Sequence, residues 1–567
     1  MKKIIFKYQF LIAGFVLSLG CNTLQAQDKL ATILQEELNR EFAVLKVQEV
    51  PAYYMAYRVD DLKSYNIAAQ FGALVQSSMN NNVRVLTITI RVGSSQLDNF
   101  HTIRNANGGT ETYYNTVELP LEDNADAIKN IVWKATNGAY QDAVSKFSKV
   151  KANISVKIAE EDRSPDFSVS TPSVYEEKPL NFESLMFNKK EWERRTKKYS
   201  SVFLKDSAIF YGVSGINFQI SRKYFVSTDG DKVVQNISAC NVTIQGTIKA
   251  KDGMELPLYK NFFAYRPASL ASDNEMQKSA ETIVDNLIAL KNAPVANPFS
   301  GPALLSAEAA GVFFHEIFGH RVEGQRMKNE NDAQTFRKKV GEQVLPKSLS
   351  VYSNPLLKTY AGIDLNGFYT YDDQASKAEN VSVVENGVLK NFLMSRTPIS
   401  GFPKTNGHAR SGIGLQVESR QSNLVIETSN PKTAEELRAE LIRLAKEQKA
   451  EYGYLFQEVT GGFTTTGRYN PSAFNVTPTL VYRVYVDDRP DEIVRGVNLI
   501  GTPLSMFAQI DMAGGNKGVF NGTCGAESGS VPVSCCSPMV LVKVVETQKN
   551  VKSQERSYIL ARPAENN

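Results

Sequence analysis

The 567-residue sequence predicts an α+β protein, with a mixed N-terminal α/β region followed by a strand-rich C-terminal domain that opens with a core-facing helix. Amphipathic helices and alternating strands are mixed between residues 28 and 291. A short linker at 292–298 contains two prolines and predicts a domain boundary. Beyond it, most apolar segments are short and strand-like. We therefore predict an N-terminal domain at 27–298 and a C-terminal domain at 299–567, after a removable segment at 1–26.

The first 26 residues have the pattern of a secretory signal. Two lysines precede an apolar stretch at 10–19, and residues 24–26 offer a small-residue cleavage site. We expect this segment to be removed and the mature protein to be exported to the bacterial periplasm or the exterior. Residues 18–21, Ser-Leu-Gly-Cys, resemble a lipobox, so lipid attachment at Cys21 is a less favoured alternative. No other stretch approaches the ~18 apolar residues that a transmembrane helix needs.

In the N-terminal region, apolar residues at helical spacing predict helices over 28–47, 122–149, 186–198 and 275–291. Alternation of Tyr, Val, Ile and Thr with polar residues predicts strands over 51–60, 66–76 and 83–93. Residues 208–249 read as a meander, with a hairpin turn at Thr228-Asp229-Gly230-Asp231.

The C-terminal region is predicted to open with a helix that begins near Ser300 and Pro302 and carries apolar residues through Ile317. Strand-like segments follow at 380–396, 422–427, 478–487 and 538–547, with one helix at 433–450.

The composition is that of an ordinary globular protein, with 42% hydrophobic and 22% charged residues. The formal charge of +4 falls to about +1 once the three lysines of the first segment are removed. Because no basic stripe with interleaved aromatics occurs, we expect no nucleic-acid partner. The four cysteines that remain are too few for a disulfide framework.

Two of the four histidines of the chain lie in the run His-Glu-Ile-Phe-Gly-His, at His315 and His320. Imidazole is the commonest zinc ligand, and a neighbouring glutamate is the usual general base in zinc hydrolases. The run therefore predicts a zinc site with Glu316 as the base. A chance pairing of histidines on a buried helix is the alternative.

The spacing of these histidines is unusual. On an ideal helix two residues five positions apart point about 140° from each other, so their side chains could not share one ion. We expect the helix to be unwound here, by a π-bulge that Gly319 would tolerate.

A catalytic zinc usually has a third protein ligand and one open position. Cys524 is the strongest candidate, because it lies between glycine-rich turns and is expected to be an accessible loop thiol. His101, His408 and several acidic residues remain possible.

Four further residues could assist the chemistry. Asp372 and Asp373 could orient a histidine, with a solvated turn as the alternative. His408 and Arg410 could stabilise a developing oxyanion, with a structural role as the alternative.

Several stretches together resemble the TldD/PmbA metallopeptidase family. They are His315 through Gly324, Tyr371-Asp372-Asp373, Glu385 through Lys390, Asn406 through Arg410, Asn521 through Gly525, and Val531-Pro532-Val533. In that family TldD-type members carry the His-Glu-x-x-x-His zinc helix and a C-terminal cysteine ligand, whereas PmbA-type members lack the zinc motif. This chain resembles the TldD type.

The resemblance implies a zinc peptidase that acts on unfolded or short peptides inside a cavity enclosed by a dimer. The dimer would be a homodimer or a heterodimer with a PmbA-type subunit. A catalytically silent peptide-binding or assembly partner is the alternative, although the intact Glu316 argues against it. Family members are largely cytoplasmic, so their substrates do not carry over to an exported chain.

Cys535 and Cys536 stand where the family resemblance leads us to expect small residues, and the sequence assigns them no function. Because they follow Cys524 closely, we expect a disulfide with Cys524 to form if zinc is removed under oxidising conditions.

Overall fold

The computed structural model describes residues 28–103, 115–154, 162–468 and 473–549. The expected signal segment, including Cys21, lies outside these residues. Within the described ranges, no helix has both the length and the apolar character needed to cross a membrane.

The N-terminal part of the chain forms one seven-stranded sheet with the order β3-β2-β1-β5-β6-β4, and β7 pairs with β6. Its strands are β1 Ala52–Gln70, β2 Ala73–Val92, β3 Thr116–Glu118, β4 Val174–Glu176, β5 Ile209–Ser227, β6 Lys232–Lys249 and β7 Glu255–Ala264. The strands expected at 51–60 and 66–76 are largely one continuous strand, which turns back at Phe71 and Gly72. The predicted hairpin at 228–231 connects β5 and β6.

Four helices lie where their periodicity predicted them: α1 Lys29–Leu45, α2 Ala125–Ile154, α3 Lys189–Ser201 and α4 Asp273–Asn292. Asp28 caps α1 by accepting from the amides of Leu30 and Ala31. α1 and α2 pack on one end of the sheet around Tyr57 and Leu86, whereas α3 and α4 pack at the other end.

The C-terminal part begins with a strand rather than with the helix that carries His315. Residues Phe299–Leu305 form β8, which lies between β17 and β24. The helix α5 follows at Ala307–Ile317 and is capped by Ser306. The expected start near Ser300 was therefore wrong, because a short apolar run such as Pro302-Ala303-Leu304-Leu305 fits a buried strand as well as a helix.

Two larger sheets enclose α5. The six-stranded sheet has the order β13-β12-β9-β16-β23-β22, and the second seven-stranded sheet has the order β17-β8-β24-β20-β18-β19, with β21 on β24. An additional β17–β18 pairing closes five strands of the latter into a ring. α5 packs against β17 and β18 on one side and against β22 and β23 on the other.

The strands of these sheets are β9 Leu349–Ser353, β12 Val381–Glu385, β13 Val388–Leu389, β16 Asn423–Thr428, β17 Tyr452–Thr464, β18 Phe474–Tyr485, β19 Glu492–Val494, β20 Val497–Gly501, β21 Ile510–Ala513, β22 Gly518–Ala526, β23 Gly529–Ser537 and β24 Val540–Lys549. The remaining short elements are α6 Gln325–Lys328, α7 Ala434–Glu447, α8 Pro503–Gln509, and the strand pairs β10 Thr359–Tyr360 with β11 Ile363–Asp364 and β14 Ala409–Arg410 with β15 Glu418–Ser419.

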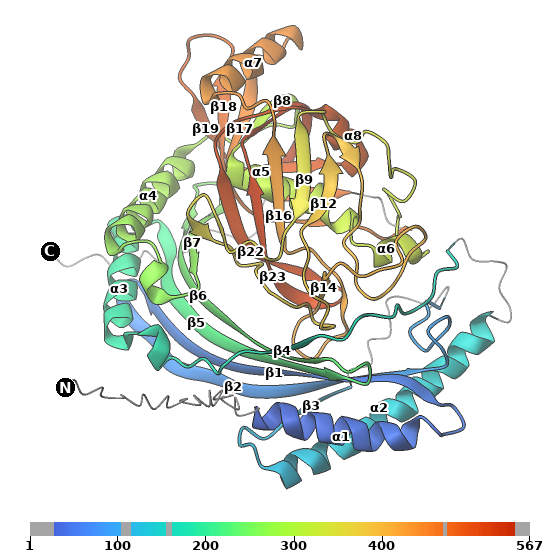
Figure 1. Cartoon of the computed structure of the whole chain (residues 1–567). Helices are drawn as coiled ribbons and strands as arrows, with labels where there is room; N and C mark the ends of the chain where they lie inside the picture. The colour runs from blue at the N-terminus through green and yellow to red at the C-terminus, as the bar shows by residue number, and fades with distance from the viewer. Residues whose placement is uncertain (1–27, 104–114, 155–161, 469–472, 550–567) are drawn as a thin grey trace, which may run out of the picture.

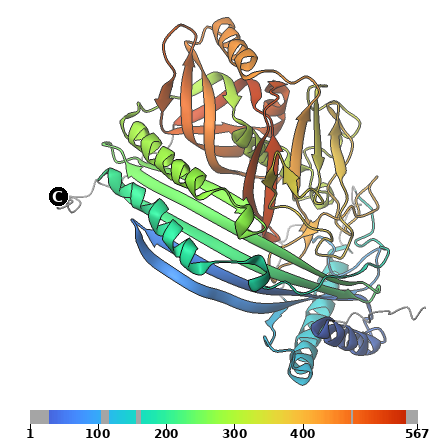
Figure 2. The same cartoon turned by 60° about the vertical axis from the view of Figure 1, so that its left-hand side comes forward.

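The N-terminal sheet curves around the lower side of the C-terminal part, as Figures 1 and 2 show. Partly buried ion pairs join the two parts: Lys223 of β5 contacts Asp373 at 2.6 Å, and Arg396 contacts Asp229 at 2.7 Å. The hydroxyl of Tyr259 on β7 also donates to the carbonyl of Thr460 on β17 at 2.7 Å. The structure is thus α+β as the sequence predicted.

Candidate metal centre

The helix α5 ends between the two histidines. It stops at Ile317, Phe318 leaves helical geometry with φ −124° and ψ −54°, and a 3-10 turn at Gly319–Arg321 carries His320. The expected π-bulge was therefore wrong, although the chain does depart from α geometry where two ligands five residues apart require it. The turn brings the two imidazole rings to a centroid distance of 4.8 Å.

Gly319 is needed for space rather than for conformational freedom. A Cβ atom at this position would lie 1.8 Å from Oε1 of Gln421, which is itself buried. The absence of a side chain therefore lets the turn approach the segment that carries Gln421.

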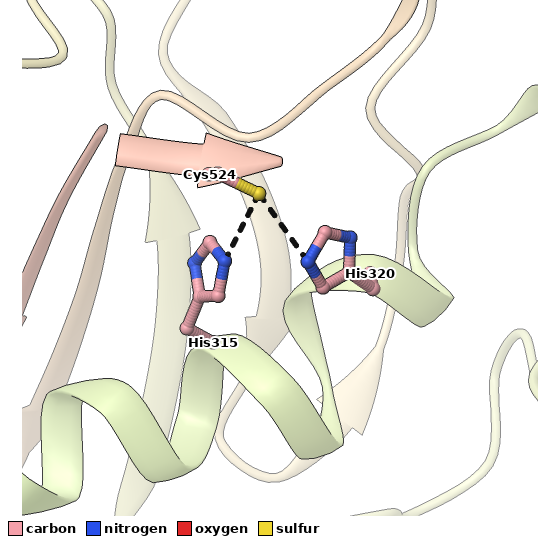
Figure 3. A group of neighbouring side chains, drawn as sticks. All are labelled: His315, His320 and Cys524. Carbon is pink, nitrogen blue, oxygen red and sulfur yellow. Dashed lines mark hydrogen bonds between the residues drawn. The ribbon is translucent and has the colours of Figure 1, made fainter. Parts of the chain in front are cut away.

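Cys524 reaches both histidines from β22. Its Sγ lies 3.2 Å from Nε2 of His315 and 3.3 Å from Nε2 of His320 (Figure 3). The residue is only 4% exposed, so the accessible loop thiol expected from the flanking glycines was wrong. Those glycines belong to a strand that pairs with β23 through a two-residue hairpin connection.

The three donors fit a zinc ion in type and in spacing. Among the residues that the structure describes, His315, His320 and Cys524 form the single His/Cys/Asp/Glu group able to hold a metal, with donor atoms within 4.8 Å of one another. Tetrahedral zinc with usual bond lengths would separate a nitrogen and a sulfur ligand by about 3.6 Å. Two imidazoles and one thiolate leave a fourth position open, as in catalytic zinc sites.

The electrostatics of the cluster favour the thiolate. Burial alone would raise the pKa of the Cys524 thiol, but the two imidazoles outweigh it and hold this pKa well below its usual value. Nη2 of Arg420 also lies 3.1 Å from the sulfur and 2.8 Å from the Cys524 carbonyl oxygen. Cys524 is therefore prepared to bind a cation.

A fully buried carboxylate supports His320. Oε2 of Glu323 lies 3.2 Å from Nδ1 of His320 and accepts from Nε of Arg326 at 2.9 Å. Burial opposes ionisation, but His320 and Arg326 together lower the pKa of Glu323. Glu323 therefore stays ionised and turns Nε2 of His320 toward Cys524.

Glu316 lies beside the cluster on the last turn of α5. It is 6% exposed and lines a cavity of about 760 Å³ that His315, His320 and Cys524 also line. Burial raises its pKa, against the effect of the two imidazoles. A Cβ atom at Gly462 of β17 would lie 2.7 Å from Cγ of Glu316, so this glycine leaves room for the glutamate.

The cavity has a mostly uncharged wall. It is formed by polar and aromatic residues of both parts of the chain, including Gln245, Tyr259, Asn261, Thr460, Phe463 and Phe520. Arg326 also lines it, but its guanidinium is held by Glu323 and by Glu527 at 2.8 Å.

None of the four assisting candidates lines this cavity. The carboxylate of Asp372 accepts from the backbone amides of Gln374, Ser376 and Ala409, and Asp373 pairs with Lys223. These contacts do not orient a histidine; they fix a loop and join the two parts of the chain.

His408 and Arg410 likewise have structural contacts. Nε2 of His408 lies 3.0 Å from Oγ of Ser353, and Nη1 of Arg410 donates to the carbonyl of Gln421 at 2.6 Å. Both side chains are buried and neither lines the cavity, which favours the structural role over the oxyanion role. His101, the other alternative ligand, lies 2.8 Å from Asp166 and outside the cluster.

The disulfide expected after removal of zinc under oxidising conditions stays a prediction, and the strand register shows that β22 and β23 would have to move for it to form. All four cysteines in the described ranges are free, and the hairpin pairs Cys524 with Val531 but Cys535 with Phe520. Four residues of strand separate the two cysteines, about 13 Å at roughly 3.3 Å per residue. A disulfide needs Cα atoms within about 7 Å.

Sequence reasoning missed Glu323, Arg420 and Gly462. The i, i+3 spacing of Glu323 from His320 was a signal for a histidine partner. The pair Gly461-Gly462 within an apolar alternating stretch was a signal for a close approach. Arg420 gave no local signal, since its contact with Cys524 joins residues far apart in the chain.

Comparison with known proteins agrees with this site. Residues 299–549 match the PmbA/TldA metallopeptidase C-terminal domain. A metalloprotease of Archaeoglobus fulgidus is 29% identical over 47% of this chain and 58% of its own length. A zinc metalloprotease TldD homolog of Saccharolobus solfataricus is 26% identical over 43% of this chain and 50% of its own. The chain thus matches about half the length of these curated relatives.

The solved structure of TldE from Thermococcus kodakarensis is similar over 92% of this chain and all of its own, with a TM-score of 0.60 and 14% identity. At this identity the likeness shows the fold alone, and it includes the N-terminal sheet. Residues 299–549 therefore match a PmbA/TldA metallopeptidase C-terminal domain, and the named relatives agree with the TldD/PmbA resemblance of the sequence.

Proposed function

We propose that this protein is a zinc metallopeptidase that hydrolyses unfolded or short peptides. The observation that carries the proposal is the convergence of three buried side chains, His315, His320 and Cys524, with Glu316 in one cavity. The names of the curated relatives, metalloprotease and zinc metalloprotease, support it.

Each of these residues would have a separate role in peptide hydrolysis. His315, His320 and Cys524 would hold the zinc, which supplies a Lewis acid that polarises the scissile carbonyl. Glu316 would take the proton of the attacking water and pass it to the leaving amine. Glu323 and Arg420 would keep His320 and Cys524 in place. The uncharged wall would receive the extended peptide.

Two parts of the proposal rest on other grounds. Assembly as a homodimer, or as a heterodimer with a PmbA-type subunit, rests on the family resemblance. Export to the periplasm or the exterior rests on the signal-like pattern of residues 1–26.

Two variants test the chemistry. Glu316→Gln is expected to keep stoichiometric zinc but to hydrolyse an unfolded fluorogenic peptide on the order of 10² to 10⁴ times more slowly, because the amide cannot accept the proton. Cys524→Ala is expected to lose most of the zinc and the activity together. Zinc content by atomic emission and the initial rate of hydrolysis are the two measurements.

Glu308→Gln is the matched control, since Glu308 lies on the same helix but its half-buried side chain pairs with Lys260 and does not line the cavity. It should retain both zinc and activity. Native-rate hydrolysis by Glu316→Gln would show that another group takes the proton. Full zinc occupancy in Cys524→Ala would place the third ligand elsewhere. A native protein that binds zinc but hydrolyses no unfolded peptide would favour the silent-partner alternative.

A further inference from the structure

The two candidate histidine ligands have different partners on their remaining ring nitrogens. Nδ1 of His320 faces the Glu323 carboxylate at 3.2 Å, whereas Nδ1 of His315 faces Sγ of Cys535 at 3.6 Å. Metal-bound histidines almost always donate this second N–H to a carboxylate, a carbonyl or water. A thiol in this place is unusual.

Strand pairing on both sides of β23 holds Cys535 next to His315. β23 is an inner strand, in which Cys535 pairs with Leu424 of β16 and with Phe520 of β22. α5 lies close on this strand, because a Cβ atom at Gly311 would be 3.0 Å from the Cys535 carbonyl oxygen and 3.1 Å from its Cβ. Gly311 and His315 are four residues apart and therefore share one face of the helix. The contact between His315 and Cys535 thus follows from how α5 packs on β23.

The neighbouring Cys536 has a different environment. Its side chain points to the opposite face of the sheet, where it packs with Val425, Val519 and Leu365. Cys535, in contrast, lines the same cavity as His315, His320 and Cys524. The vicinal pair is therefore two thiols with separate surroundings.

We propose that Cys535 is a positioning residue that holds His315 with Nε2 toward the metal position. This inference rests on the proposed function. When Nε2 acts as the ligand, the single ring proton sits on Nδ1, and Nδ1–H donates to the Cys535 sulfur. The thiol thereby selects the tautomer and limits rotation of the ring. Because sulfur is a weak acceptor, His315 is less strongly supported than His320 with its carboxylate.

Three variants test the proposal: Cys535→Ala, Cys535→Ser and Cys536→Ala. Cobalt(II) and zinc affinities of the metal-free full-length proteins would be measured by competition with a chromophoric chelator, and the visible spectrum of the cobalt form would report ligand geometry. Cys535→Ala is expected to weaken binding about 10- to 100-fold and to alter the cobalt bands, because the His315 N–H loses its acceptor. Cys535→Ser, which keeps an acceptor, should recover part of that loss.

Cys536→Ala removes the same sulfur from the same strand and should bind both metals like the native protein. Equal metal affinity in Cys535→Ala and Cys536→Ala would overturn the positioning role while leaving the zinc site intact. Equal losses in Cys535→Ala and Cys535→Ser would also overturn it, because they would indicate lost packing rather than a lost acceptor. A native protein that takes up neither metal would overturn the proposed function and this inference with it.

Discussion

At the scale of single residues, hydrogen-bond partners distinguish the two candidate ligand histidines from a histidine with structural contacts. His315 and His320 each turn one nitrogen toward Cys524. His408 is equally buried, but its two nitrogens face Ser353 and Asn406, and no thiolate or carboxylate contacts it. Burial lowers the pKa of His408 to about 3, and the charge of Arg410 acts in the same direction. His408 is therefore neutral in the folded protein.

We predict that His408 does not titrate between pH 8 and pH 5 in the folded state. The unfolded histidine takes up its proton near pH 6.5, whereas the folded one does so only near pH 3. The unfolded state then binds more protons in this window, so stability falls as the pH falls. At pH 5.5 this one group costs about 1.4 kcal/mol.

The check is the pH dependence of the histidine ring-proton shifts by NMR, with His408→Gln to identify the signal. The native protein should also lose more stability between pH 7.5 and pH 5.5 than this variant does. A His408 signal that titrated near pH 6.5 would contradict the neutral, buried assignment.

At the scale of secondary-structure elements, the site depends on where α5 ends and on which strands can approach it. Gly311 lets β23 lie close to the helix, and Gly462 lets β17 lie close to Glu316. Both glycines have neighbours where a Cβ atom would stand. The position of Glu316, the proposed general base, therefore depends on a strand that carries none of the proposed ligands.

We predict that Gly462→Ala keeps the metal but slows hydrolysis. The added methyl group would lie 2.7 Å from Cγ of Glu316 and 2.7 Å from the carbonyl oxygen of Asn475, so either the base or the strand must move. A displacement on the order of 1 Å can reduce a rate by about a hundredfold. Zinc content and the initial rate of peptide hydrolysis are the measurements.

Gly525→Ala serves as the control, because Gly525 lines the same cavity and an added Cβ there meets nothing within 4 Å. It should hydrolyse the peptide at nearly the native rate. If the two alanine variants were equally active, the close contact between Gly462 and Glu316 would not matter for catalysis.

Elements with a long, regular pattern could be predicted from the sequence. α1, α4 and the hairpin of β5 and β6 lie close to their predicted bounds. In each of them, apolar residues recur at helical or strand spacing over many residues. β8 and β22 could not be predicted in this way. β8 is short and mostly apolar, and β22 contains three glycines, which are typical of turns. Both segments are strands because they pair with other strands, β8 with β17 and β24 and β22 with β23.

The candidate site shows the same division. His315, Glu316 and His320 were found because they lie within six residues of one another. Cys535 and Arg420 were not, because their contacts with His315 and Cys524 join segments more than a hundred residues apart. Asp372 and Asp373 fit neither the histidine-orienting role nor the solvated turn, because both are buried and contact backbone amides or Lys223. Local sequence does not show which way such a side chain points.

At the scale of the whole molecule, both parts of the chain build the cavity. β6 and β7 of the N-terminal sheet contribute Gln245, Tyr259 and Asn261 to the cavity that His315, His320 and Cys524 also line. The hydrogen bond from Tyr259 to Thr460 ties this wall to the strand that also carries Gly462. The N-terminal sheet is therefore a part of the candidate site as well as a support for it.

We predict that unfolded chains are hydrolysed much faster than folded proteins. The candidate ligands are only 4% to 7% exposed, and the cavity of about 760 Å³ lies in the size range of small-ligand sites. An extended segment of peptide can enter such a space, but a compact domain cannot bring a backbone carbonyl to the cluster without unfolding locally. The measurement compares one small disulfide-stabilised protein in its native form and after reduction and alkylation, with zinc-loaded enzyme and the Glu316→Gln variant as the blank. The alkylated form should be degraded and the native form should persist. Equal rates for the two forms would mean that the cavity opens far more widely than the structure shows, and would remove burial of the site as the basis of selectivity.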